Sequence, residues 1–249
     1  MREDKGPADP TPAMGLRSLL DLPVEMGWRH VLFANWPVDP ALVDAHLPAA
    51  LDVDTYDGDA WLSVVPFTNV AVRPEAVPAS LGFRLPELNL RTYVTRGDDA
   101  GVYFFSLDAD GILGVTGARL FHHLPYFYAD ISLPVVDGAV SFTSRRRHPG
   151  ARPCDFAATY EPVGEGWQSD RGSLAEFLTE RYRYYTETPG GDLRYAQISH
   201  PRWPLYDADV DVRRNEVFET NGFAHPESDP LMLYSPGVDV RATGSRRPE

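Results

Sequence analysis

Four polar side chains of different chemistry occupy alternate positions in the segment 87–94 (ELNLRTYV): Glu87, Asn89, Arg91 and Tyr93. On an extended strand all four share one face. A guanidinium binds a planar carboxylate through two parallel hydrogen bonds, and burial moves the pKa of a carboxyl group towards neutrality, where it works as an acid or a base. If this face points inwards, the pattern is typical of the polar wall of a small-molecule cavity.

Two other interpretations of the same face stay open. If the face points to solvent, the four residues form an ordinary polar surface. If they are buried without a ligand, Glu87 and Arg91 must pair with each other in a structural network, because an unpaired buried charge costs several kcal/mol.

Lysine is almost absent from this chain. Of the 23 basic residues, 22 are arginine and one is lysine, Lys5, close to the N-terminus. The body of the protein therefore cannot use a buried lysine, which excludes Schiff-base formation, anchoring of pyridoxal phosphate and the lysine of a phosphate-binding loop.

No metal or cofactor is expected. His122 and His123 are adjacent, and adjacent side chains diverge on a helix and oppose each other on a strand, so the pair cannot simply chelate one ion. The only cysteine, Cys154, excludes an internal disulfide and fits a reducing compartment. The segment 200–204 (HPRWP) is extended and rigid, and its indole either reaches a cavity rim or packs in the core.

The charge balance limits the partners. A formal net charge of −13 disfavours nucleic acid and anionic membrane surfaces, which need clustered Lys and Arg. No apolar run reaches the roughly 18 residues of a membrane span, and residues 1–14 lack the apolar core of a signal peptide. We therefore expect a cytoplasmic protein. Its excess of acid over lysine is typical of adaptation to high salt or of a genome that favours arginine codons.

The pattern along the chain indicates many short strands. Proline (23 residues) and glycine (20 residues) interrupt the chain throughout. Apolar and β-branched residues alternate with polar ones in the segments 29–36, 60–67, 88–94, 102–108, 139–144, 156–160, 193–199 and 231–234. The turn residues at 95–101 make 88–108 a hairpin. The sequence thus predicts a mainly β, single-domain, antiparallel barrel or sandwich with a few peripheral helices.

Two helices are predicted from their N-terminal caps. Asp39 and Pro40 begin the first, which Pro48 stops. Ser173 begins the second with Glu176 three residues on. Helical spacing extends this second helix through Leu174, Phe177, Leu178, Tyr182 and Tyr185. A third helical turn is predicted at 115–122. We expect the domain to span residues 15–242, with disordered tails at 1–14 and 243–249.

Six strings in the chain carry a family resemblance. They are GDAWLSVVPF (58–67), ELNLRTYV (87–94), GVYFFSLDA (101–109), ARLFHHLPYFYADI (118–131), HPRWPL (200–205) and YSPGVDV (234–240). Together they resemble the YqjF-like family, domain of unknown function 2071, over residues 22–240. That resemblance implies the fold of the acetoacetate decarboxylase-like superfamily, a curved antiparallel sheet closed into a cone-shaped barrel, and it implies no established activity.

The resemblance also shows where this chain departs from its relatives. Acetoacetate decarboxylases form a Schiff base on a lysine that follows an aromatic-Pro pair after the hairpin, with Arg and Glu lining the same pocket. The nearest counterpart here is 124–127 (LPYF), in which Tyr126 and Phe127 stand where two lysines are expected. Neither side chain can form an imine, whereas Glu87 and Arg91 remain counterparts of the polar lining.

The sequence therefore suggests a binding protein, and leaves open whether it is an enzyme. The expected ligand is a small carboxylate or ketone, bound without a cofactor, with Glu87 or His123 as acid or base. The candidate ligand-binding residues are Glu87, Asn89, Arg91, Tyr93, Arg119, His123 and Tyr126. The alternative is a non-catalytic structural or protein-interaction module on the same fold, and a homo-oligomer is compatible with both.

Overall fold

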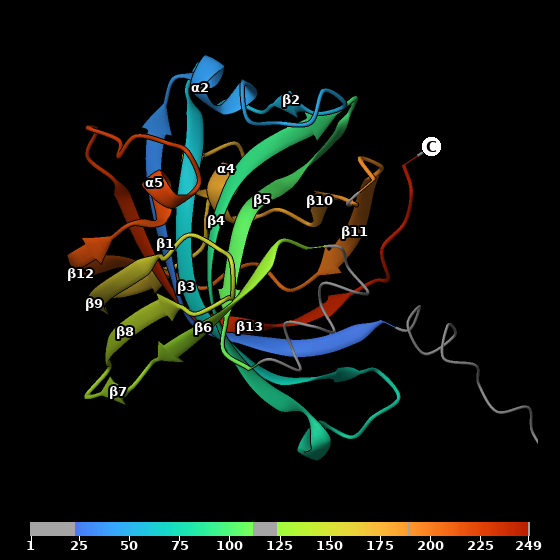
Figure 1. The fold of residues 1–249 in the computed structure, drawn as a ribbon. Helices are drawn as coiled ribbons and strands as arrows, with labels where there is room; N and C mark the ends of the chain where they lie inside the picture. The colour runs from blue at the N-terminus through green and yellow to red at the C-terminus, as the bar shows by residue number, and fades with distance from the viewer. Residues whose placement is uncertain (1–22, 112–123, 189, 249) are drawn as a thin grey trace, which may run out of the picture.

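One continuous sheet of 13 strands dominates the part of the chain that the computed structural model describes, residues 23–111, 124–188 and 190–248 (Figure 1). The strands are β1 (Val24–Val38), β2 (Asp52–Val53), β3 (Ala60–Pro74), β4 (Phe83–Arg96), β5 (Asp99–Ala109), β6 (Tyr126–Ser132), β7 (Val135–Val136), β8 (Ala139–Arg146), β9 (Asp155–Trp167), β10 (Arg183–Glu187), β11 (Leu193–Ser199), β12 (Leu205–Asn215) and β13 (Leu231–Ala242). The helices are short: α2 (Pro40–Asp44), α4 (Leu174–Thr179), α5 (Val217–Thr220) and the 3₁₀ turn η1 (Ala79–Leu81). The mainly β fold class predicted from the sequence is confirmed.

All eight segments that were predicted from alternating hydrophobicity lie inside strands, in β1, β3, β4, β5, β8, β9, β11 and β13. The predicted hairpin is confirmed as well, because β4 and β5 pair from Glu87 opposite Ala109 to Arg96 opposite Asp99. Its turn is tighter than the predicted loop. Gly97 has a φ of +59°, a left-handed conformation that glycine adopts without steric cost.

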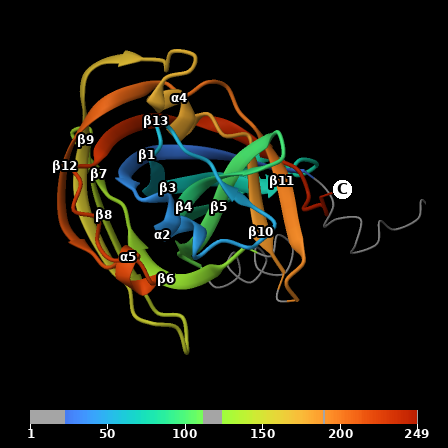
Figure 2. The same ribbon diagram turned by 90° about the horizontal axis from the view of Figure 1, so that it is seen from above.

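The sheet closes on itself in two ways. Strand β5 pairs along its length with β4, while its other edge pairs with β10 and β6 at different heights. Strand β13 likewise pairs with β1 on one edge, and with β11 and β12 on the other. Strands β13, β1, β3, β4 and β5, the central sheet, are therefore shared by both closures. Figure 2 shows the middle strands of this sheet with β8, β9 and β12 on one side and β10 and β11 on the other.

Both faces of the central sheet are consequently buried. On one face, residues such as Leu32, Leu62 and Leu88 pack with Phe142 and Phe156 of β8 and β9, which forms the first core. The opposite face, the second core, contains two clusters. One unites Tyr93 and Leu107 with Tyr184 of β10, and the other unites Phe33 and Phe67 with Trp203. From Leu85 to Val94 strand β4 therefore has no solvent face, and the residues that alternate along it face one core or the other, whereas Asp239 and Arg241 of β13 are exposed.

The caps of both predicted helices are confirmed. The Asp39 side chain accepts a hydrogen bond from the Ala41 amide, and Ser173 Oγ accepts one from the Glu176 amide. The predicted extension of the second helix to Tyr185 is wrong, because α4 ends at Thr179 and Tyr185 lies in β10. Pairing with β5 and β11 satisfies the backbone of this segment in the sheet instead.

Three further predictions concern the two ends of the chain and the segment 115–122. We expected residues 243–249 to form a disordered tail, but the Thr243 amide donates to the Gln197 carbonyl oxygen, and Arg246 and Tyr195 exchange two backbone hydrogen bonds. These residues continue, along the same edge of β11, the pairing that β13 begins at Ile198 and Ser199, which hydropathy could not indicate. The predicted tail at 1–14 and the helical turn at 115–122 lie outside the described residues. No helix in the described ranges is long and apolar enough to cross a membrane.

A buried ion pair ties the central sheet to its closing strands. Arg146 on β8 donates from Nε to Asp108 Oδ1 (2.7 Å) and from Nη2 to Asp108 Oδ2 (3.0 Å), and both side chains are almost inaccessible to solvent. The guanidinium carbon also lies 4.1 Å from the centroid of the Phe127 ring. Burial raises the pKa of Asp108, and the contact with Arg146 opposes that shift.

We predict that Arg146→Met lowers the free energy of unfolding by about 3 to 5 kcal/mol, because it leaves the Asp108 carboxylate buried without a cation. The matched control is Arg147→Met on the next residue, whose partner Asp130 is exposed to solvent, and we expect it to change stability little. Urea unfolding of the two variants measures the difference. Equal losses would contradict a special role for the buried pair.

Candidate functional site

A cavity of about 410 Å³ lies on the second-core side of the central sheet. Side chains from β1, β3, β4, β5, β6, β10, β11 and β13 form its walls, together with Leu124 before β6 and Trp203 from the segment before β12. Its volume falls in the range of small-molecule sites, and most of its lining is apolar. The cavity is therefore the concave feature in which polar groups of β4 can meet a ligand.

Strand β4 supplies the polar part of the wall. Glu87, Asn89 and Arg91 all line the cavity, and each is buried, while Leu88 and Leu90 between them pack in the first core. The predicted sharing of one face is thus realised on the inner side, because both faces of β4 are covered. The interpretation as a solvent-facing polar surface is wrong.

Glu87 sits in a cage of hydrogen-bond donors. Its Oε2 accepts from the Tyr126 hydroxyl (2.7 Å) and from Asn69 Nδ2 (3.3 Å), and its Oε1 accepts from Asn89 Nδ2 (3.2 Å). Burial raises the pKa of Glu87 to about 6, although these three donors pull it down. Tyr126 holds its proton firmly, since burial and the neighbouring Glu87 raise its pKa well above the usual value.

Arg91 has no carboxylate partner among the described residues. Its Nη2 donates to the Leu178 carbonyl oxygen (3.0 Å) at the end of α4, and its guanidinium carbon lies 5.4 Å from the centroid of the Phe33 ring. Its Nε is buried and makes no hydrogen bond within the described ranges. A guanidinium offers several donors and stays charged at any ordinary pH, so this site is prepared for an anion.

Glu87 and Arg91 do not pair with each other, which was one of the expected arrangements. They are four residue steps apart on an extended strand, about 13 Å along β4, so their side chains start from different parts of the cavity wall. Asn89, midway between them, also has an unused group, because its Oδ1 is buried without a donor in the described part of the chain. The polar wall thus gives the Glu87 carboxylate three hydrogen-bond donors, whereas Arg91 has no carboxylate partner among the described residues.

The remaining predicted residues fall into two groups. Tyr126 lines the cavity, whereas Phe127, its neighbour on β6, packs against Arg146 instead. Tyr93 faces the second core but does not line the cavity, and its hydroxyl donates to the Leu178 carbonyl oxygen (2.9 Å). Arg119 and His123 lie outside the described residues.

Aromatic residues that no polar pattern could predict complete the wall. Trp203 stacks on Trp28 with ring centroids 5.8 Å apart and meets Phe33 edge to face at 5.1 Å. All three line the cavity, and the buried Trp203 Nε1 has no acceptor among the described residues. The rigid segment 200–204 was the one signal in the sequence that an indole reaches a cavity. Nothing in the sequence indicated Asn69, which meets Glu87 because β3 pairs with β4.

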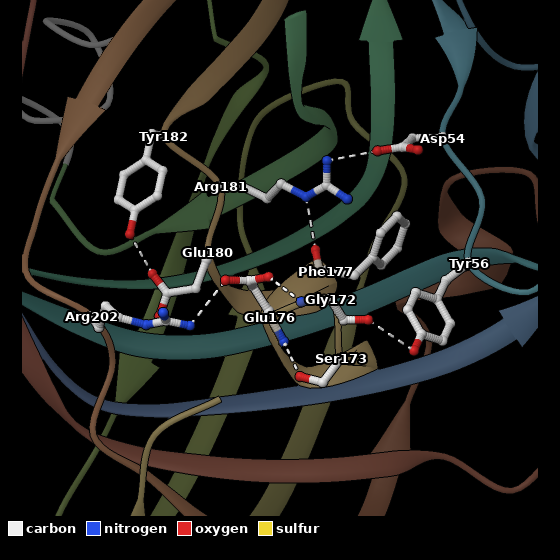
Figure 3. Close-up of a pocket in the computed structure, with 10 residues that line it drawn as sticks. All are labelled: Asp54, Tyr56, Gly172, Ser173, Glu176, Phe177, Glu180, Arg181, Tyr182 and Arg202. Atoms are coloured by element: carbon white, nitrogen blue, oxygen red, sulfur yellow. Dashed lines mark hydrogen bonds and ion pairs between the residues drawn. The ribbon is translucent and has the colours of Figure 1, made fainter. Parts of the chain in front are cut away.

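A second hollow, beside α4, differs in its electrostatics (Figure 3). Its charged side chains already have partners: Arg181 donates to Asp54 (2.7 Å) and Arg202 to Glu176 (3.0 Å). Glu180 accepts from the Tyr182 hydroxyl and from the Trp203 amide. The hollow therefore has little unsatisfied charge to offer a ligand, and its network instead fixes α4 and Trp203 beside the cavity.

Metal ligands do not cluster in the described ranges. No group of three or more His, Cys, Asp or Glu residues there is placed to hold an ion. The cavity itself offers one carboxylate, Glu87, whose oxygens are engaged by three donors.

Comparison with solved structures shows the same fold in proteins of low sequence identity. The acetoacetate decarboxylase from Legionella pneumophila superposes with a TM-score of 0.63 at 12% identity, over 91% of this chain and 87% of that one. An acetoacetate decarboxylase-like enzyme from Sphingomonas wittichii RW1 gives 0.60 at 18% identity, over 92% and 94%. The enduracididine biosynthesis enzyme MppR, complexed with the condensation product of pyruvate and imidazole 4-carboxaldehyde, gives 0.63 at 12%, over 99% and 98%.

Comparison of sequences gives a nearer relationship. The chain is 44% identical over 214 residues to the uncharacterized protein YqjF of Bacillus subtilis (strain 168), which covers 86% of this chain and 87% of that protein. The model of the DUF2071 family, described as an uncharacterized conserved protein, matches residues 25–239. This match takes in all of the described residues that line the cavity except Val24 and Ala242. The chain therefore belongs to the DUF2071 family, with the fold of the acetoacetate decarboxylase-like proteins.

Proposed function

We propose that this protein binds a small organic carboxylate in the cavity of the central sheet, with Arg91 as the anchor for the anion. One observation carries the proposal: a buried guanidinium that lacks a carboxylate partner among the described residues faces a cavity of about 410 Å³. An unpaired buried charge is costly, and a bound carboxylate removes that cost through charge-assisted hydrogen bonds.

Glu87 is the group in this cavity that can exchange a proton with the ligand. Its pKa of about 6 puts both protonation states within reach near neutral pH, and the Tyr126 hydroxyl keeps its carboxyl group in place. A ketone or a carboxylate with an adjacent carbonyl group has acidic protons on which such a base acts. Glu87 would then transfer the proton, and Arg91 would bind the carboxylate.

The proposed chemistry does not involve an imine. The only lysine, Lys5, precedes the described residues, and Tyr126 occupies the cavity wall at the position where the family resemblance places a lysine. The alternative, a structural or protein-interaction module, has no use for an open cavity with converging polar groups. The cavity therefore favours the binding function over that alternative.

Arg91→Met should weaken binding of small carboxylates such as pyruvate and acetoacetate by about 10- to 100-fold, because it removes charge-assisted hydrogen bonds worth roughly 1.5–3 kcal/mol. Isothermal titration calorimetry measures the change. Arg73→Met is the matched control, since Arg73 also lines the cavity but is already paired with Glu25. If both variants bind like the wild-type protein, Arg91 is not the anchor. If no carboxylate binds the wild-type protein, the proposal fails.

Borohydride reduction in the presence of an isotope-labelled ketone should leave no covalent adduct on residues 15–249, because no lysine lies there to form an imine. Mass spectrometry of the intact protein and of its peptides detects any adduct. The variant Lys5→Arg serves as the control for labelling of the N-terminal segment. An adduct within the body of the domain would overturn the imine-free mechanism.

The pKa of Glu87 predicts a pH dependence of stability. Because the folded value, about 6, exceeds the ordinary value of 4.5, the folded protein holds the proton more tightly. The resulting stabilisation is fully present below pH 4.5 and is lost as the pH rises through 6. The loss of this proton should lower the unfolding free energy of the wild-type protein between pH 5 and pH 8. We expect this decline to be smaller by about 1 kcal/mol in Glu87→Gln.

Urea unfolding at the two pH values gives this decline for the wild-type protein and for each variant. The control is Glu161→Gln on β9, an exposed residue, which should keep the wild-type decline. An unchanged decline in Glu87→Gln would show that Glu87 has no raised pKa in the folded protein.

A further inference from the structure

The described wall of the cavity is mostly apolar, and its polar side chains are set among apolar ones: Phe67 lies opposite Glu87, Leu107 opposite Asn89 and Phe104 opposite Arg91 on the paired strands. The lining side chains with hydrogen-bonding groups are Trp28, Asn69, Arg73, Glu87, Asn89, Arg91, Tyr126, Tyr184 and Trp203. The rest of the described wall is mostly aliphatic and aromatic. It includes Phe67, Phe104, Leu107 and Ile198, none of which brings a hydrogen-bonding group. A ligand that carries polar groups over its whole surface would lose hydration against these apolar side chains without compensation.

The charge of the wall fits one anionic group. Three charged residues line the described cavity: Arg73, Glu87 and Arg91. Arg73 donates to Glu25 and to the Ala71 and Val77 carbonyl oxygens, so its guanidinium is engaged. This leaves Arg91 to bind an anion. A second carboxylate on the ligand would be buried without a cation, near Glu87 or in the apolar part.

The volume of the cavity exceeds the needs of the smallest carboxylates. About 410 Å³ corresponds to roughly 14 water molecules at about 30 Å³ each. A three-carbon keto acid held at Arg91 would leave most of this apolar space to water. An apolar group attached to the carboxylate would displace that water, and its burial would make the free energy of binding more favourable.

We infer that the ligand is a monocarboxylate with a sizeable apolar body, aromatic or aliphatic, whose carboxylate meets Arg91 and whose body lies against Phe67, Phe104, Leu107 and Ile198. This inference rests on the proposed function and narrows it from carboxylates in general to one amphipathic class. Trp203 contacts Phe33, over which Arg91 also lies, and its Nε1 is a buried donor that has no acceptor among the described residues.

Titration calorimetry with butanoate, hexanoate, octanoate and 3-phenylpropanoate tests the inference. We expect affinity to rise about fourfold for each methylene that enters the apolar part, until the space is filled. Octanedioate has the same chain as octanoate and a second carboxylate, and it should bind at least tenfold more weakly. Octanamide, which lacks the charge, should also bind more weakly, and Arg91→Met should abolish the difference between octanoate and octanamide.

A pair of variants tests where the apolar body lies. Ile198→Thr places a hydroxyl group on the cavity wall and should weaken octanoate several-fold while it leaves pyruvate unchanged. Ile131→Thr is the matched control, since Ile131 is also a half-buried strand residue but packs against the first core. Circular dichroism and thermal unfolding establish that both variants are folded before they are compared.

The outcomes separate this inference from the proposed function. Short carboxylates that bind through Arg91 with no gain on lengthening the chain would overturn the inference and leave the proposed function intact. Octanedioate or octanamide binding as tightly as octanoate would also overturn it, as would equal effects of the Ile198 and Ile131 variants. If no carboxylate of any length binds, both the inference and the proposed function fail.

Discussion

Burial of the central sheet on both faces is the constraint on which the rest of the structure depends. Because β5 and β13 each pair with two further strands on one edge, the same five strands carry the first core on one face and the second core on the other. A polar residue in the buried part of β4, from Leu85 to Val94, therefore cannot reach solvent by pointing away from a core. It needs a protein partner or a cavity, and the second core provides both.

The buried side chains of Glu87 and Arg91 on β4 differ in their hydrogen-bond partners. Glu87 collects donors from three strands, and its remaining cost of burial appears as a raised pKa rather than as a lost hydrogen bond. Arg91 is a buried cation, so its N–H groups need hydrogen-bond acceptors. Leu178, at the end of α4, supplies one, and the cavity leaves room for others. The network beside α4 holds Trp203 in place, because the Trp203 amide donates to Glu180 directly after that helix.

The relatives of this chain clarify what the fold contributes. Proteins that share 12% to 18% of their residues with it have the same arrangement of strands, so the closed sheet and its interior are properties of the scaffold. The chemistry of such an interior is set by a few side chains. In this chain those side chains are a carboxyl group, an amide, a guanidinium and a phenol, in a body without lysine.

The sequence by itself determined eight of the 13 strands in the described residues, the two helix caps, the lysine-free body and the set of polar residues that share a face of β4. These follow from local rules, such as the period of two along a strand and the side-chain cap at Asp39 or Ser173. The tertiary structure alone decided what that face meets. Tyr126 reaches Glu87 across 39 residues of chain, Trp203 closes the wall from still further away, and Tyr185 joins the sheet although its spacing suits a helix. Contacts between distant segments depend on how the sheet closes, and closure is set by the pairing of whole strands rather than by any local pattern.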